Sequence, residues 1–396
     1  MGPHQADQAP KQSRKRKAST TLTRPTPQHL AVPVPPRAMS NGIPPHYAYL
    51  LDHWSTTLAS FITMAPTAQN PFHTCITPMI AHSPSLRSAV CSMAAHHLGI
   101  LRADPSLLNS ATRHQIDAVS SLRNTIGTEN PLVSLAIIMI LQITDRLFTT
   151  NSGVNHLKGA RVVIERAGPR TWNCDVGVFL LSLCCYHDAV VSVAGRTPPI
   201  LGLGDNVSYL ERLEPMQGLK ILWAIIGQIS SMGSQEEGLL DNQGTAIEHN
   251  LRDLDIYVSH EGDAAHTFHA YKEAAYIYLH RVWHNVGSPH PATLKHARDC
   301  LRHLFQVPVS SPLVSVHPWP FWTAACETID SKLRGLVRDR LKAMYELRHL
   351  PSLKRLEQDI EDIWKIKDEE RTVTGIDRVD CVQAILAIRN RGADLV

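Results

Sequence analysis

From His46 onward, apolar residues recur at spacings of three and four, and this periodicity constrains the fold more than any other feature. Such spacing places the side chains on one stripe of an amphipathic helix, and no stretch of clear period-two alternation competes with it. We therefore expect an all-α fold. The first stripe comprises Tyr47, Leu50, Leu51, Trp54, Leu58, Phe61 and Ile62. Further helices are expected at residues 107–126, 132–148, 154–167, 176–193, 217–232, 265–285, 292–305, 319–349, 352–370 and 378–391.

Local signals mark some of the helix ends. Ser83 is placed to cap a helix that starts at Pro84 and ends before Gly99. Near the C-terminus, one long helix over 319–349 is expected to meet another at Pro351. Antiparallel pairs joined by short loops predict an irregular multi-helix architecture rather than a four-helix bundle. The buried seam of the long helix is expected to contain Trp322, Cys326, Ile329, Leu333, Leu336, Met344 and Leu347.

The composition suits a chain with a sizeable core, since 43% of residues are hydrophobic and 19% are charged. No window reaches the roughly 18 apolar residues of a spanning helix, because Leu132 to Ile143 is too short and the stretch after Val176 meets His187 and Asp188. We expect no membrane segment and an intracellular protein. The cysteines lie among apolar neighbours and are expected to be reduced and buried; they are Cys75, Cys91, Cys174, Cys184, Cys185, Cys300, Cys326 and Cys381.

Charge divides the chain in two. Residues 1–45 hold seven basic residues against one acidic residue, a net charge of +6, which leaves −3 on the other 351 residues. Nine of the 26 prolines also lie in this segment. Because proline removes a backbone donor and disfavours helix before it, residues 1–45 are expected to be a disordered tail. Residues 46–396 are then the helical body.

The tail contains a compact cationic run. Arg14, Lys15, Arg16 and Lys17, with Lys11 nearby, fit a nuclear-localisation signal that binds an acidic import receptor. The same charges can contact phosphate weakly and in a salt-dependent way. The alternative is an ordinary solvated charge run.

A series of short segments resembles the fungal-specific transcription factor domain, in its second large family, over about Tyr47 to Ala387. The resemblance implies an all-helical, nuclear, regulatory protein and no catalytic residue; for this chain we expect no cofactor and no metal site. The segments are the opening helix with Trp54; Asn70-Pro71-Phe72; Ser83-Pro84-Ser85-Leu86-Arg87-Ser88-Ala89-Val90 running into Ala94-Ala95-His96-His97-Leu98; His156-Leu157-Lys158-Gly159-Ala160-Arg161; Ala275-Tyr276-Ile277-Tyr278-Leu279-His280-Arg281; His317-Pro318-Trp319-Pro320-Phe321-Trp322 leading to Ala325-Cys326-Glu327; and Ile363-Trp364 with Asp368.

The sequence departs from this family in lacking a zinc cluster. Two zinc ions sharing bridging sulfurs need six cysteines with two Cys-x-x-Cys pairs, and this sequence has no Cys-x-x-Cys and no cysteine before Cys75. Two explanations stay open: an upstream exon carries the cluster, or the protein joins a DNA-binding transcription factor. A homodimer through the helical body is a further expected assembly.

The segment around Gly159 is a candidate for contact between helices. Gly159 and Ala160 permit close approach of another backbone, with Lys158 and Arg161 projecting on the other side, so this segment is a candidate helix–helix contact; ordinary core packing is the alternative. Zinc-hydrolase, nucleophile-elbow and phosphate-loop motifs are absent from the sequence. We therefore expect a non-enzymatic nuclear regulator of a local gene set such as a secondary-metabolite cluster. The alternative is a non-catalytic helical scaffold with no role in transcription.

Overall fold

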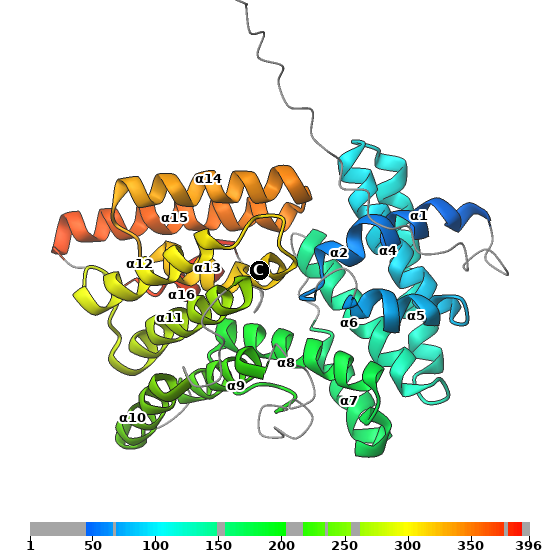
Figure 1. Cartoon of the computed structure of the whole chain (residues 1–396), viewed down its shortest axis with the longest axis horizontal. Coiled ribbons are helices and arrows are strands. Elements are labelled where there is room, and N and C mark those ends of the chain that lie inside the picture. Colours follow the sequence, from blue (N-terminus) through cyan, green and yellow to red (C-terminus); the bar gives the residue numbers. More distant parts are fainter. Residues whose placement is uncertain are drawn as a thin grey trace, which may run out of the picture. The chain divides into compact units, whose positions relative to one another are not determined.

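The structure is a computed structural model that describes residues 45–65, 69–148, 155–202, 217–233, 237–254, 262–375 and 379–389. The regular elements within these ranges are all helical (Figure 1), which confirms the predicted all-α fold class. The α-helices are α1 (Ala48–His53), α2 (Ala59–Phe61), α3 (Thr77–Ile80), α4 (Pro84–Leu101), α5 (Pro105–Thr125), α6 (Pro131–Phe148), α7 (Leu157–Ala167), α8 (Asp175–Gly195), α9 (Gln217–Met232), α10 (Glu237–Asp253), α11 (Asp263–His284), α12 (Pro291–Gln306), α13 (Pro318–Cys326), α14 (Ser331–Arg348), α15 (Pro351–Thr374) and α16 (Cys381–Arg389).

The first group of helices, α1 to α7, packs around the buried indole of Trp54. The Trp54 ring meets the ring of Phe72 edge-on at 5.8 Å between centroids, and its Nε1–H donates to Thr77 Oγ1 at 3.1 Å. A π-helical segment, Trp54–Leu58, links α1 to α2 and keeps most of the predicted opening stripe buried. This stripe anchors the N-terminal core.

Helix α4 begins where the sequence predicted and ends later. Ser83 Oγ accepts the backbone N–H of Leu86 at 3.2 Å, which confirms Ser83 as the N-cap. Gly99 does not end the helix, which continues to Leu101. A Cβ at Gly99 would stand 2.7 Å from Leu108 Cδ2, so a larger residue here would have to displace the Leu108 side chain of α5. The glycine that looked like a stop signal lies at a close contact between α4 and α5.

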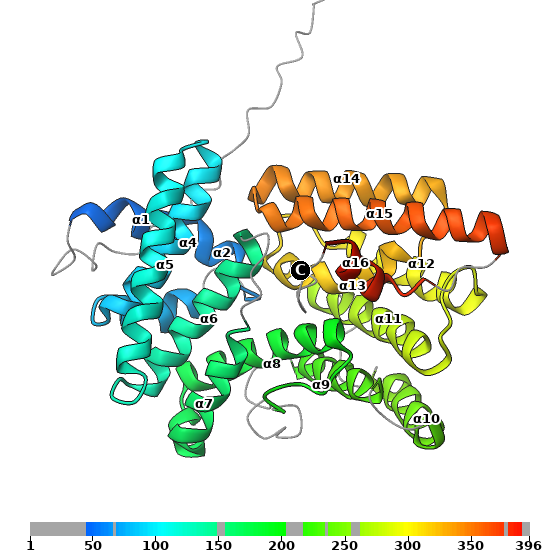
Figure 2. The ribbon, with the colours of Figure 1, turned by 180° about the vertical axis from the view of Figure 1, so that it is seen from behind.

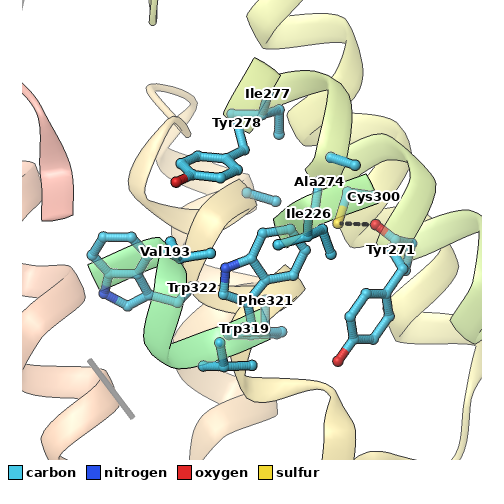
Figure 3. Close-up of a cluster of buried hydrophobic side chains, with 14 of the residues drawn as sticks. Val193, Ile226, Tyr271, Ala274, Ile277, Tyr278, Cys300, Trp319, Phe321 and Trp322 are labelled. Atoms are coloured by element: carbon cyan, nitrogen blue, oxygen red, sulfur yellow. Dashed lines mark hydrogen bonds between the residues drawn. The ribbon is translucent and has the colours of Figure 1, made fainter. Parts of the chain in front are cut away.

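The second group, α9 to α16, buries a set of large aromatic side chains. Figure 3 shows Trp319 of α13 close to Tyr271 and Tyr278 of α11. The rings of Tyr271 and Trp319 stack at 5.6 Å, and the Tyr271 hydroxyl donates to the carbonyl of Val316 at 2.6 Å. The aromatic entry to α13 is therefore a packing wedge.

Helix α8 belongs to both cores. Its first half, including Leu180 and Cys184, packs into the first group, whereas its second half, including Tyr186 and Val190, packs into the second. Across the same seam, Arg355 of α15 donates to the carbonyl of Arg146 in α6 at 2.6 Å. The two groups are thus joined by a shared helix and by direct bonds.

Two helices correct the expectation that no segment is long enough to span a membrane. Pro131–Phe148 and Asp175–Gly195 are long and apolar enough to cross a membrane. However, 78% and 83% of their apolar stretches are buried inside the structure. Both are central packing helices of the cores just described, and burial of this kind accounts for their apolar character.

The C-terminal helices correct two further predictions. The expected helix over 319–349 is broken between α13 and α14, because Asp330 caps a new helix by accepting the N–H of Leu333 at 2.8 Å. Ile329, Leu336 and Leu347, assigned to its buried seam, are 39%, 53% and 42% exposed. Figure 2 shows α14 along one edge, beside α15, with α16 on the other side of α15.

Helix α10 was not predicted.

Candidate functional site

The predicted site residues fall in two places. Lys11 and the run from Arg14 to Lys17 lie outside the described residues. Lys158, Gly159 and Arg161 lie in the first half of α7, which packs on α6.

On α7, the two cationic side chains face solvent and the small residues face inward. Lys158 and Arg161 are exposed, Gly159 is half-buried and Ala160 is fully buried. Arg161 donates to Glu165 at 2.7 Å within the same helix, and both side chains are more than half exposed. A Cβ at Gly159 would meet only Ile138 Cδ1, at an ordinary 3.7 Å. The site therefore has room for alanine.

The free space beside Gly159 gives a prediction about stability. Gly159→Ala should raise the free energy of unfolding by up to about 1 kcal/mol, because alanine favours helix and the added methyl group meets no close atom. Gly177→Ala is the matched contrast: its Cβ would lie 2.6 Å from the carbonyl oxygen of Trp172, so it should cost about 1–3 kcal/mol. Urea denaturation of both variants measures the difference. A destabilised Gly159→Ala would mean that a closer helix contact forms there.

A buried ionic centre lies in the C-terminal group, around the carboxylate of Glu327. Lys367 Nζ of α15 lies 2.5 Å from one carboxylate oxygen, and Arg281 of α11 donates to the other at 2.9 Å. The backbone N–H and the hydroxyl of Ser288 donate to the Lys367-bound oxygen at 2.8 and 2.9 Å. The three charged side chains are 7% exposed or less. The centre fastens α11, α13 and α15 together.

The electrostatics of this centre indicate structure rather than catalysis. Burial alone would raise the pKa of the Glu327 carboxyl, but Lys367, Arg281 and the bonds from Ser288 hold that pKa far below its usual value. A carboxylate so firmly ionised and so fully bonded is a poor proton acceptor near neutral pH. Its chemical role is to compensate two buried cations.

Buried histidines form a second kind of polar contact. His317, at the start of α13, bonds through Nε2 to Thr267 Oγ1 at 2.9 Å, and burial lowers its pKa to about 3. His53 Nε2 and His97 Nδ1 lie 2.8 Å apart, and burial, followed by the charge of His97, lowers the pKa of His53 to about 4. Among the described residues, no group of three or more His, Cys, Asp or Glu side chains could hold a metal ion.

The cysteine prediction holds for most of the eight positions. All are free thiols, and six are buried. Cys174 is exposed and Cys75 is only partly buried, which corrects the expectation that all were buried. Cys174 is exposed because it precedes the first turn of α8 at the protein surface.

The ionic centre was missed from the sequence. Its charged members lie far apart in the chain, with 46 residues between Arg281 and Glu327 and 40 between Glu327 and Lys367. Arg281 and Glu327 each end a segment that we used for the family resemblance, but neither segment indicates its partner. A lysine at position 367 within an otherwise amphipathic helix gives no signal that its side chain is 1% exposed.

Comparison with known proteins gives one result. The model of the family described as fungal specific transcription factor domain matches residues 49–386. The matched span runs from α1 into α16 and thus includes both groups of helices, the ionic centre and α7. Searches of curated proteins and of solved structures found no match.

Proposed function

Because the chain belongs to the fungal-specific transcription factor domain family, and is thus a fungal-type transcriptional regulator, we propose that it acts in the nucleus on a local set of genes. A secondary-metabolite biosynthetic cluster is the gene set that we propose. The observation that carries the proposal is the family match over residues 49–386, which covers nearly the whole helical body.

The proposed partners are a DNA-binding transcription factor or a second copy of the chain. Support for such an interface comes from α14, where the apolar side chains of Leu336 and Leu347 are 53% and 42% exposed. The two positions are eleven residues apart, which places them on the same side of a helix. Light scattering during size exclusion, alone and with candidate partners, tests this assembly. A strict monomer in every mixture would contradict it.

Deletion of the gene tests the proposed function. Transcripts of the genes surrounding the locus should change by several fold, whereas a strain carrying the gene at another locus should recover the original levels. Transcript sequencing of the three strains makes the comparison. Unchanged transcripts across the genome would remove the proposal, and changes confined to distant genes would remove only its local character.

Nuclear import gives the second prediction. We expect the tail residues Arg14, Lys15, Arg16 and Lys17 to direct import, because adjacent cationic side chains can bind the acidic groove of an import receptor. Replacing all four with alanine should move a fluorescent fusion from the nucleus to the cytoplasm. The matched control replaces exposed Lys158 and Arg161 of α7, which removes two charges without touching the tail. Nuclear fluorescence that survives the four alanines would refute the assignment.

A further inference from the structure

A cavity of about 80 Å³ lies at the seam between the two groups of helices. Residues of α2, α6, α8, α14 and α15 line it, together with the segment before α13. A single water needs only about 10–15 Å³, so the cavity has room for a small molecule. Most of the wall is apolar, including Phe61, Ile143, Leu183, Val316, Met344 and Leu353.

The charged groups in this wall are cations. Arg146 and Arg348 contribute guanidinium groups that are 6% and 3% exposed, and the lining contains no aspartate or glutamate among the described residues. Arg348 donates to the carbonyl oxygens of Phe61 and Ser311, both at 2.9 Å. These acceptors satisfy hydrogen bonds but carry no formal charge. No described carboxylate therefore compensates the positive charge of Arg348.

Arg348 also retains an unused donor. Its Nε–H is buried and has no hydrogen-bond acceptor within the described part of the chain. Burial, together with the nearby charge of Arg340, lowers the pKa of Arg348 to about 10, which is still high enough to keep the group protonated at neutral pH. A buried, charged donor without an acceptor costs free energy unless an anion or polar group meets it.

His187 adds a second donor to the wall. Arg146 donates to its Nδ1 at 3.0 Å, and this bond fixes the tautomer with the proton on Nε2. Burial and the charge of Arg146 hold the pKa of His187 well below its usual value, so the ring is neutral. The hydrogen bonds of His187 do not use Nε2. The cavity thus combines an apolar wall with the neutral ring of His187 and the positive charges of two buried arginines, Arg146 and Arg348.

We propose that this cavity binds a small aliphatic monocarboxylate, whose carboxylate lies toward Arg348 and His187 and whose hydrocarbon chain packs on the apolar wall. Charge-assisted hydrogen bonds from arginine to a carboxylate are strong and become stronger where water is excluded. A dry cavity of about 150 Å³ holds benzene, so a volume of about 80 Å³ suits an acid of about two to four carbons. The ligand would touch both groups of helices and stabilise their junction.

Thermal unfolding of the full chain tests the proposal with acetate, propionate and butyrate as probes. At constant ionic strength, the best probe should raise the unfolding midpoint by about 3–5 °C at about 100 times its Kd. Chloride and the neutral analogue butyramide should give no shift, because they lack the carboxylate or its charge. Octanoate should give none because it is too long. Absence of a shift with all three acids, or an equal shift with butyramide, would overturn the proposal.

Two variants locate the site by calorimetric titration with the best probe. Arg348→Met should weaken binding at least about 30-fold, since truncating one member of a buried charge pair costs several kilocalories per mole. Leu353→Phe keeps both arginines but fills the cavity with a larger side chain, so it should abolish binding. This variant keeps the proposal testable if Arg348→Met does not fold. Arg338→Met, on the outer side of the same helix as Arg348, is the control and should bind as the original chain does. Unchanged binding by folded Leu353→Phe would place the ligand elsewhere and overturn the proposal.

Discussion

Replacing Glu327 with glutamine should lower the free energy of unfolding by about 3–5 kcal/mol, because the buried ammonium of Lys367 and the buried guanidinium of Arg281 would both lose the carboxylate to which they now bond. The amide keeps the size of the side chain, so the loss reports charge rather than a cavity. Its NH₂ group would in addition face donors from Lys367, Arg281 or Ser288, with which it cannot form a bond. Urea denaturation followed by circular dichroism measures the change.

The control for this prediction is an ion pair that is exposed to solvent, Arg161 with Glu165. Glu165→Gln removes the anion of the Arg161–Glu165 pair, whose side chains are 57% and 60% exposed, and should change stability by less than about 0.5 kcal/mol. A double variant of Glu327→Gln with Lys367→Met should be more stable than the sum of the two single losses predicts, because it leaves one fewer buried cation that has lost its bond to Glu327. Equal costs for Glu327→Gln and Glu165→Gln would show that the centre is not buried as described.

Lowering the pH from about 7.5 to about 5.5 should cost roughly 2–3 kcal/mol of stability through two buried histidines, His187 and His317. Their folded pKa values lie below the ordinary value of 6.5, at about 3 for His317 and well below 6.5 for His187. As the pH falls below 6.5, the unfolded chain therefore takes up protons that the folded chain does not. The stabilising contribution is complete above pH 6.5 and decreases down to the folded pKa.

Each of these histidines contributes about 1.3 kcal/mol to the difference between the two pH values. Burial is the main cause for both, and nearby guanidinium groups add to it: Arg146 faces His187, whereas Arg340 and Arg348 face His317. A His317→Gln variant can still bond to Thr267 but does not titrate, so the stability that it loses between the two pH values should be smaller by about 1.3 kcal/mol. Urea curves at both pH values measure this. Identical pH dependence in the original chain and in His317→Gln would contradict the assignment.

The helices that the sequence predicted well have strong local signals. Ser83 and Pro84 together fix the start of α4, and the apolar runs of α6 and α8 are long enough to exclude other elements. Local signals also caused the errors. Gly99 was interpreted as the end of a helix, although it lies within α4, where Leu108 of α5 comes close. The N-cap at Asp330 was missed because the apolar pattern continues on both sides of it.

The polar contacts between distant parts of the chain were beyond sequence reasoning for a different reason. Arg281 and Glu327 lie 46 residues apart in the chain, and His97 bonds to the carbonyl of Arg348 across 251 residues. Spacing along a helix cannot indicate such pairs. The cavity likewise depends on side chains from both cores, which meet only after α8 has brought the two groups together.

The most direct test of the account is chromatin immunoprecipitation of the tagged, full-length protein, combined with transcript sequencing of the deletion strain. If the chain is a nuclear regulator of a local gene set, it should be enriched at promoters near its own locus, and those promoters should belong to genes whose transcripts change on deletion. Absence of promoter enrichment, in cells where the tagged protein restores the original transcript levels, would contradict action at those genes.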